Sequence, residues 1–387
     1  MTSTNRPTLG IGLVGHAFMG RAHSHAWRSA DAFFDLPWRP VLSVLAGRDT
    51  ERATAAATRL GWANAVGDWK DLLERDDVDL IDICTPGDSH AEIAVAALQA
   101  GKHVLCEKPL ANTVAEAEAM AAAAERAARR GIRSMVGFTY RRVPALALAR
   151  NLVAQGRIGA IRHVRAQYLQ DWLADPEAPL SWRLDRRRAG SGALGDIGAH
   201  IIDATRFVTG ETLTGVSALL DTFVTERPLP DGPGNGPVTV DDAALFLGRL
   251  SGGGLASFEA SRVAAGRKNA LRLELNGTRG SLAFDLEAMN ELWFHDHTEE
   301  PATAGFRRIL VTEPQHPYAG RWWPPGHGLG YDHSFTNEIA DLVIAIAAGK
   351  DPEPTFADGL SVQRVLAAVE ASAADAGRWT ATTGAQT

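Results

Sequence analysis

Apolar and polar positions follow a repeating order through the first third of the chain. Short apolar runs, each long enough for a buried strand, alternate with stretches of helical spacing, and Gly or Pro stands at most joints. The predicted strands cover residues 11–14, 41–46, 78–84, 103–106 and 133–138. Strands that alternate with helices in this way predict a parallel, doubly wound sheet.

The pattern changes after residue 138. A helix at 144–154, a strand at 161–168 and a helix at 196–208 lead into several short strand-like runs between 216 and 311, joined by Gly, Asn and Asp. Runs of this kind favour an antiparallel sheet. We therefore predict an α/β protein. Its expected parts are a doubly wound domain at residues 1–138, an α+β domain with an open, largely antiparallel sheet at 139–378, and a disordered tail at 379–387.

The first strand leads into a G-x-A-x-x-G turn made by Gly15, Ala17 and Gly20, and a helix opens near Phe18. Small residues let the backbone approach a pyrophosphate, and the helix N-terminus supplies free N–H donors. Because alanine replaces the middle glycine, the turn alone fits an ordinary βα joint equally well. The strand–helix repeat behind it favours a dinucleotide-binding Rossmann domain, with Gly15, Ala17, Phe18, Met19 and Gly20 as cofactor residues.

The second strand ends at Gly47 and Arg48. In dinucleotide-binding domains an acidic residue at this point usually binds the adenosine ribose. Glycine leaves room for a 2′-phosphate and arginine pairs with one, so NADP is favoured over NAD. The alternative is a surface turn with a solvated arginine.

Two further groups of residues carry possible chemistry. Glu107 and Lys108 follow a parallel strand, where open α/β sheets bind ligands, and a lysine there can stabilise a developing alkoxide. Asp196 and His200 are four residues apart, so on a helix they share one face, with Asp203 a turn further. A histidine beside a carboxylate can act as a general base. The alternative interpretations are that Lys108 is a solvated surface lysine, and that Asp196 and His200 form a surface ion pair or a helix cap.

Composition narrows the function classes. A net charge of −7 argues against a general nucleic-acid or anionic-membrane binder. Both cysteines, Cys84 and Cys106, lie in apolar runs without metal-ligand spacing, so no metal site is predicted. The first residues contain no apolar stretch typical of a signal peptide, and no apolar run is long enough to span a membrane. A cytoplasmic location is therefore expected.

Taken together, G-x-A-x-x-G followed by His23, then CTPGDSH, LCEKPLA and GSGALGDIGAHIID, resemble the Gfo/Idh/MocA oxidoreductase family. The resemblance implies a Rossmann domain and a C-terminal α/β domain whose open sheet forms a homodimer or homotetramer. It implies Lys108, Asp196 and His200 as the catalytic residues. The residues implied beside the nicotinamide are Thr85, Pro86, His90, Glu107 and Lys108. Besides the catalytic three, the substrate pocket would contain Tyr140, Arg141, Tyr168, Asp171, Trp182 and Arg183.

These observations predict an NAD(P)-dependent dehydrogenase that oxidises a ring secondary alcohol of a sugar, anhydrosugar or cyclitol. His200 would take the hydroxyl proton, Asp196 would orient His200, and Lys108 would hold the oxygen. Two alternatives remain open at this stage. One is a glycoside hydrolase of the same fold that retains and recycles NAD, and the other is a cofactor-binding sensor without catalysis.

Overall fold

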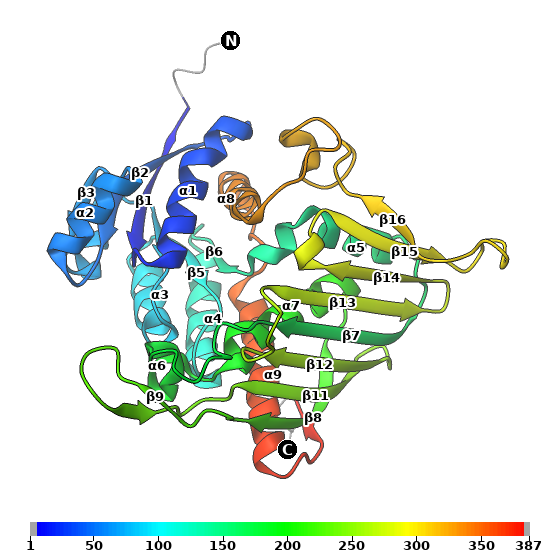
Figure 1. Ribbon diagram of the computed structural model, residues 1–387. Helices are drawn as coiled ribbons and strands as arrows, with labels where there is room; N and C mark the ends of the chain where they lie inside the picture. The colour runs from blue at the N-terminus through cyan, green and yellow to red at the C-terminus, as the bar shows by residue number, and fades with distance from the viewer. Residues whose placement is uncertain (1–5, 383–387) are drawn as a thin grey trace. The chain divides into compact units, whose positions relative to one another are not determined.

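The computed structural model describes residues 6–382, which divide into two compact units (Figure 1). The first unit contains residues 6–139 and 330–360, and the second contains residues 140–329 and 361–382. Each unit is built around one large sheet. Among the described residues, no helix is long and apolar enough to cross a membrane.

The first unit contains a six-stranded parallel sheet in the order β3-β2-β1-β4-β5-β6. Its strands are β1 (Thr8–Val14), β2 (Arg39–Ala46), β3 (Asn64–Val66), β4 (Leu80–Ile83), β5 (His103–Glu107) and β6 (Ser134–Gly137). Its helices include α1 (Phe18–Phe33), α2 (Thr50–Leu60), α3 (His90–Gln99) and α4 (Val114–Ala128). The predicted doubly wound sheet is confirmed, with the strand order of a dinucleotide-binding fold.

One late helix, α8 (Tyr331–Ala347), belongs to this first unit, although the sequence analysis places it in the second domain. Phe335, Ile339 and Val343 of α8 share a buried core with Leu9 and Trp27. The apolar face of α8 therefore packs on α1, a long-range contact that the local sequence pattern does not show.

The second unit contains a nine-stranded sheet in the order β16-β15-β14-β13-β7-β12-β11-β8-β17. Neighbouring strands are antiparallel except for the parallel pair β7 and β12, so the predicted largely antiparallel sheet is confirmed. The strands are β7 (Ile161–Leu169), β8 (Leu213–Asp221), β11 (Ala243–Leu250), β12 (Leu255–Ser261), β13 (Ala270–Gly277), β14 (Gly280–Asp285), β15 (Glu291–Asp296), β16 (Arg307–Leu310) and β17 (Thr380–Ala381). A separate hairpin is formed by β9 (Glu226–Pro228) and β10 (Asn235–Pro237).

The expected disordered tail is partly ordered. Strand β17 pairs with β8, and the Thr382 hydroxyl donates a hydrogen bond of 2.5 Å to the Leu213 carbonyl. Residues 383–387 lie outside the described residues. The two ladder pairs of β17 are a tertiary contact at a sheet edge, which the polar sequence of the tail does not predict.

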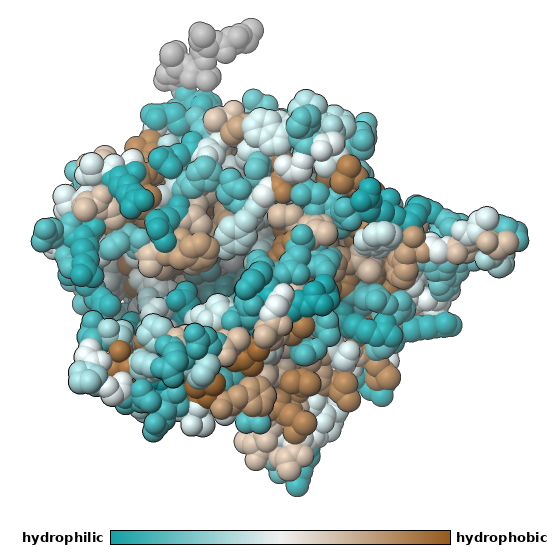
Figure 2. Space-filling view, in the orientation of Figure 1, coloured by the Kyte–Doolittle hydropathy of each residue, from teal (hydrophilic) through white to brown (hydrophobic). Residues whose placement is uncertain are grey.

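Helices cover one face of the large sheet and leave the other face open (Figure 1). The helices of this unit are α5 (Pro144–Ala154), α6 (Arg186–Ala189), α7 (Ala199–Thr209) and most of α9 (Phe356–Ala374). Leu219, Leu245, Leu247 and Leu255 are between 50% and 67% exposed on β8, β11 and β12. Figure 2 shows hydrophobic atoms gathered over these three strands.

Candidate active site

The turn after β1 has the geometry of a pyrophosphate cradle. Gly15 has φ +96°, and a Cβ atom there would lie 2.9 Å from the Cys84 carbonyl oxygen. A Cβ atom on Gly20 would lie 2.1 Å from the Gly15 carbonyl oxygen, so both positions require glycine. The first turn of α1 contains no acidic residue, and no side chain caps it at Ala17. Exposed N–H donors and the positive end of α1 therefore fit a dinucleotide phosphate.

At the end of β2, a histidine ring lies close to the position that is expected to contact the adenosine ribose. A Cβ atom on Gly47 would lie 2.8 Å from two ring atoms of His16. The His16 ring therefore fills the space that an acidic side chain at position 47 would need. Arg48 is exposed beside it. A side chain at position 47 would therefore require the half-buried His16 ring to move, and the sequence pattern gave no signal for this contact.

The residues after β4 and β5 are held together by a buried histidine. His90 is 1% exposed, and its two ring nitrogens lie 3.0 Å from the Pro109 carbonyl oxygen and 2.9 Å from the Thr85 carbonyl oxygen. Both nitrogens are thus used in fixing the two strand ends. Thr85, Pro86 and Lys108 are only half-buried, so among the residues predicted beside the nicotinamide these three have accessible surface. His90 itself is buried and contacts the backbone carbonyl oxygens of Thr85 and Pro109.

Glu107 belongs to a buried polar cluster beneath Lys108. His23 on α1 lies between two carboxylates, with Nδ1 2.9 Å from Asp82 Oδ1 and Nε2 3.0 Å from Glu107 Oε1. The Lys108 backbone N–H donates to Glu107 Oε2 at 3.1 Å. The Trp27 indole N–H donates to Asp82 at 2.8 Å. The carboxylate of Glu107 therefore holds the backbone at Lys108 from a buried position.

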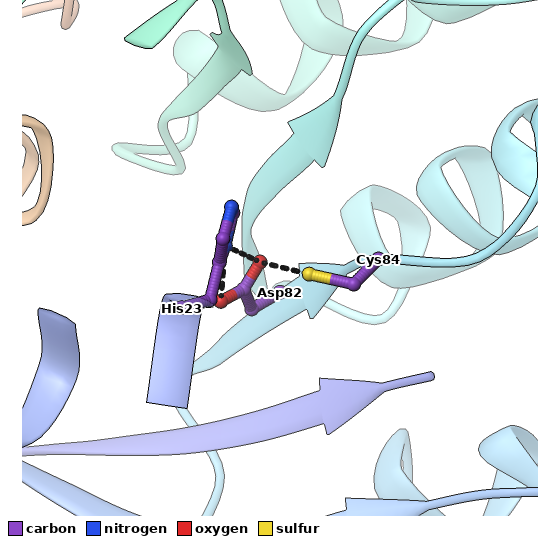
Figure 3. A group of neighbouring side chains, drawn as sticks. All are labelled: His23, Asp82 and Cys84. Atoms are coloured by element: carbon purple, nitrogen blue, oxygen red, sulfur yellow. Dashed lines mark hydrogen bonds and ion pairs between the residues drawn. The ribbon is translucent and has the colours of Figure 1, made fainter. Parts of the chain in front are cut away.

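Figure 3 shows His23, Asp82 and Cys84 converging, and their ligand atoms lie within 4.8 Å of one another. Burial opposes charge on His23, but its interactions with Asp82 and Cys84 together outweigh this effect and raise the pKa of His23 well above its ordinary value. Burial also opposes the charged form of Cys84, which is the thiolate, and therefore raises the pKa of the Cys84 thiol. With these hydrogen bonds and pKa directions the three side chains form a buried ion cluster.

In the second unit, the segment with Asp196 and His200 differs from the expected α-helix. Residues Leu194–Gly198 form a π-helical turn, and α7 begins only at Ala199. Asp196 therefore lies on the π turn and His200 on the α-helix that follows it, so the spacing of four residues falls across the junction of two helical forms. Such π turns are frequent at functional sites. Asp196 is partly exposed and His200 is 8% exposed.

The His200 ring is bordered by two tyrosines. Its centroid lies 4.6 Å from the Tyr140 ring and 5.8 Å from the Tyr168 ring. The two tyrosine hydroxyls are 2.8 Å apart, and Tyr168 donates to Asn269 at 2.7 Å. The structure therefore brings together three predicted site residues and adds Asn269. Gln170 continues the network, with its amide donating to Asn269 at 2.8 Å.

Other predicted pocket residues make separate contacts. Arg141 forms a bidentate ion pair with Asp203, at 2.8 and 2.5 Å, so Asp203 does not extend the Asp196–His200 pair. Asp171 accepts from Lys268 at 2.8 Å. The Trp182 ring is covered by the Arg183 guanidinium, whose carbon lies 4.5 Å from the ring centroid. Asn269, Gln170 and the buried Arg262 were missed, because isolated polar residues at strand ends form no sequence motif.

Each of the two units matches a known protein-family model. A family model described as "Oxidoreductase family, NAD-binding Rossmann fold" matches residues 9–138. A second model, "GFO/IDH/MocA C-terminal domain", matches residues 146–283.

Several relatives match over nearly their whole length. Levoglucosan dehydrogenase of Pseudarthrobacter phenanthrenivorans is 43% identical, with 95% of this chain and 96% of that protein covered. A solved levoglucosan dehydrogenase in complex with NADH and levoglucosan has a TM-score of 0.93, covering 97% of this chain and 99% of that one, at 43% identity. An oxidoreductase domain protein from Kribbella flavida has a TM-score of 0.96 at 68% identity, with 97% and 99% covered. Because family models match both units, the chain belongs to the Gfo/Idh/MocA family of oxidoreductases and has the family's NAD-binding Rossmann domain.

Proposed function

We propose that this protein is an NAD-dependent dehydrogenase that oxidises a ring secondary alcohol of an anhydrosugar of the levoglucosan type. The observation that carries this proposal is the 43% identity to a levoglucosan dehydrogenase over 95% of the chain. A more distant relative, inositol 2-dehydrogenase of Rhizobium meliloti, is 26% identical over a similar share of the chain. Cyclic polyols are therefore the wider substrate class, and an anhydrosugar is the specific proposal within it.

The chemistry proposed for the chain's own residues follows from their types and settings. When bound, the nicotinamide supplies the hydride acceptor. His200 takes the proton of the substrate hydroxyl, and Asp196 orients His200 and favours its charged form. Lys108 holds the same oxygen and stabilises its developing negative charge. Glu107 holds the Lys108 backbone through the 3.1 Å bond from its N–H.

The tyrosine–amide network beside His200 suits a polyhydroxylated ring. Tyr140, Tyr168, Asn269 and Gln170 are linked by hydrogen bonds of 2.7 and 2.8 Å, so their rotamers are fixed. Fixed donors and acceptors discriminate strongly against a substrate that lacks the matching hydroxyl, because buried polar groups are then left without partners. We propose Tyr140 and Tyr168 as substrate residues on this basis. Trp182 and Arg183 remain predictions, since the Trp182 ring is bordered by the guanidinium groups of Arg183 and Arg188, at 4.5 and 6.0 Å from its centroid.

The cofactor in this proposal is NAD. The NADP preference expected from Gly47 and Arg48 finds no support among the relatives, several of whose structures contain NADH. The His16 ring against Gly47 offers a physical alternative, because it places a hydrogen-bonding group near the position of the usual acid. Arg48 would then contribute a general positive charge rather than a selective contact.

The test is a matrix of levoglucosan, glucose, a 1,5-anhydrohexitol and myo-inositol against NAD⁺ and NADP⁺, followed by absorbance at the reduced-nicotinamide band. We expect levoglucosan with NAD⁺ to give the highest kcat/KM. Turnover of no polyol with either cofactor would contradict the proposal. Release of sugar from an aryl glycoside without net cofactor reduction would instead establish the hydrolase alternative.

We also propose that the open face of the nine-stranded sheet joins copies of this chain into a homodimer or homotetramer. Exposed leucines on β8, β11 and β12 lie beside a groove of about 840 Å³ lined by Ser217, Phe246, Phe258 and Glu259 among others. Contiguous exposed apolar surface on a soluble protein is typical of an interface. The leucine side chains would be buried against the same face of a second copy.

A further inference from the structure

A buried arginine lies directly behind the candidate catalytic carboxylate. Arg262 follows β12 and is 0% exposed. Its Nη1 atom lies 3.6 Å from Oδ2 of Asp196, whose side chain is 27% exposed. Asp196 therefore has a buried cation on one side and an accessible surface on the other.

The guanidinium has few other contacts. Within residues 6–382, neither Nε nor Nη1 of Arg262 has a hydrogen-bond partner, and Nη2 donates to the Asp241 carbonyl at 3.2 Å. The Trp172 ring covers the group, with 5.5 Å between the guanidinium carbon and the ring centroid. A fully buried cation with unused donors is costly unless an anion compensates it.

The backbone that carries Asp196 is anchored to the same place. The Asp241 carboxylate accepts the N–H groups of Gly192 at 2.6 Å and Leu194 at 2.8 Å. A Cβ atom on Gly192 would lie 1.8 Å from the Asp241 carbonyl oxygen, so only glycine permits this approach. Asp241 thus fixes the start of the π turn, and Arg262 faces the carboxylate two residues beyond Leu194.

We propose that Arg262 is a positioning residue that holds the Asp196 carboxylate ionised and in one orientation, so that Asp196 can orient His200. A cation within 4–6 Å favours the charged form of a carboxylate. The atoms of Arg262 are buried, so it acts through Asp196 and does not touch substrate. This inference rests on the proposed function for the role of Asp196, but the Arg262–Asp196 pairing itself does not.

The competing explanation is that Arg262 only balances the buried acids Asp241 and Asp242. The chain provides a matched control for this. Arg227 is also 0% exposed, lies in the same unit and also has an Nε atom without a partner among the described residues. Its guanidinium donates to carbonyls, at 2.7 Å to Asp175 and 2.7 Å to Leu173. Arg227→Met therefore removes a buried arginine without touching Asp196.

The experiment compares Arg262→Met, Arg262→Lys and Arg227→Met in the full chain. We expect Arg262→Met to lower kcat by about 10- to 100-fold, as is typical when the supporting partner of a site residue is removed, with little change in KM for NAD⁺. Arg262→Lys should recover much of the loss because it keeps the charge. Arg227→Met should lower the unfolding temperature while kcat stays within about twofold of wild type. Equal effects of both Met variants on kcat would overturn the proposal.

A double-mutant cycle with Asp196→Asn tests whether the effect passes through Asp196. The double variant Arg262→Met/Asp196→Asn should turn over no more slowly than Asp196→Asn alone, whereas independent roles would give multiplied losses. Thermal unfolding of the same variants tests the pairing without a measurement of enzyme activity. There the double variant should lose less than the sum of the single losses, and additive losses would contradict the pairing even if the wild type oxidised no sugar. If Arg262→Met does not fold, Arg262→Gln replaces it in both cycles.

Discussion

The Nε2 atom of His23 lies 3.0 Å from Oε1 of Glu107, the residue whose other carboxylate oxygen accepts the Lys108 backbone N–H. His23 is 1% exposed and Glu107 is 4% exposed. A buried ion cluster on α1, β4 and β5 therefore supports the loop that carries Lys108. Burial makes this cluster sensitive to the loss of any one member.

Removal of His23 should destabilise the first unit strongly. His23→Gln leaves the carboxylates of Asp82 and Glu107 without their shared cation, and breaking a buried ion pair costs about 3–5 kcal/mol. His25 on the same helix is the control, because its side chain is 46% exposed and its ion pair with Asp332 spans 3.4 Å. His25→Gln should change the free energy of unfolding by less than about 1 kcal/mol. Urea titration of both variants measures this, and equal losses would show that the cluster contributes little.

The same cluster predicts how stability depends on pH. Burial lowers the pKa of His23, but Asp82 and Cys84 together raise it well above its ordinary value. A raised folded-state pKa gives a contribution that is complete below the unfolded value of about 6.5 and is lost as pH rises through the folded value. The stability advantage of wild type over His23→Gln should therefore shrink from about pH 6.5 upward, by at most about 1.4 kcal/mol per pH unit. An advantage that grew with pH over this range would reverse the assigned direction.

The sequence predicts the parts of this molecule whose signals are local. The turn at Gly15 and Gly20 is recognisable because φ +96° and a 2.1 Å approach each demand glycine. Lys108 is recognisable because it follows a parallel strand. In contrast, Arg262 and Asn269 come close to the Asp196–His200 region only through the strand order of the second sheet. Such contacts depend on strand pairing between distant segments, which no spacing rule encodes.

The segment with Asp196 and His200 shows a different limit of sequence prediction. A separation of four residues predicts neighbouring positions on a helix, but it does not show that residues Leu194–Gly198 form a π turn before α7 begins at Ala199. The Asp241 carboxylate anchors the start of this turn by accepting the N–H groups of Gly192 and Leu194. The residue types were informative, whereas the form of the turn depends on a tertiary anchor that the local pattern does not show.

Lys108→Ala should lower kcat by at least about 100-fold, because the proposed role of the Lys108 ammonium group is to stabilise negative charge on the reacting oxygen. Lys102 is a matched control just before the same strand, and its Nζ atom donates to the carbonyls of Arg75 and Val78 at 2.8 Å each. Lys102→Ala should lower stability and leave kcat within about twofold of wild type. Steady-state kinetics with levoglucosan and NAD⁺ measure both variants. Near-normal turnover by Lys108→Ala would contradict its catalytic role.

The cofactor site gives a prediction about nucleotide choice. Wild type should have a higher kcat/KM for NAD⁺ than for NADP⁺, and His16→Ala should weaken NAD⁺ use because its ring borders Gly47. Arg48→Ala should reduce the use of NADP⁺ by about tenfold more than that of NAD⁺, since arginine pairs with a 2′-phosphate. Initial rates over both cofactor concentrations test this. Higher efficiency with NADP⁺ in wild type would restore the preference expected from Gly47 and Arg48.

Charge on the open sheet face should separate the proposed copies. Leu245 and Leu247 on β11 are 50% and 60% exposed, so lysine at either position meets little steric resistance within one chain. At an interface between two copies, however, Leu247→Lys would bury an ammonium against apolar surface, which is strongly unfavourable. Ile344 on α8 is the control, because it is 45% exposed but lies in the other unit. Light scattering should show a smaller particle for Leu247→Lys and an unchanged one for Ile344→Lys. Equal masses for both variants and wild type would place the interface elsewhere or show a monomer.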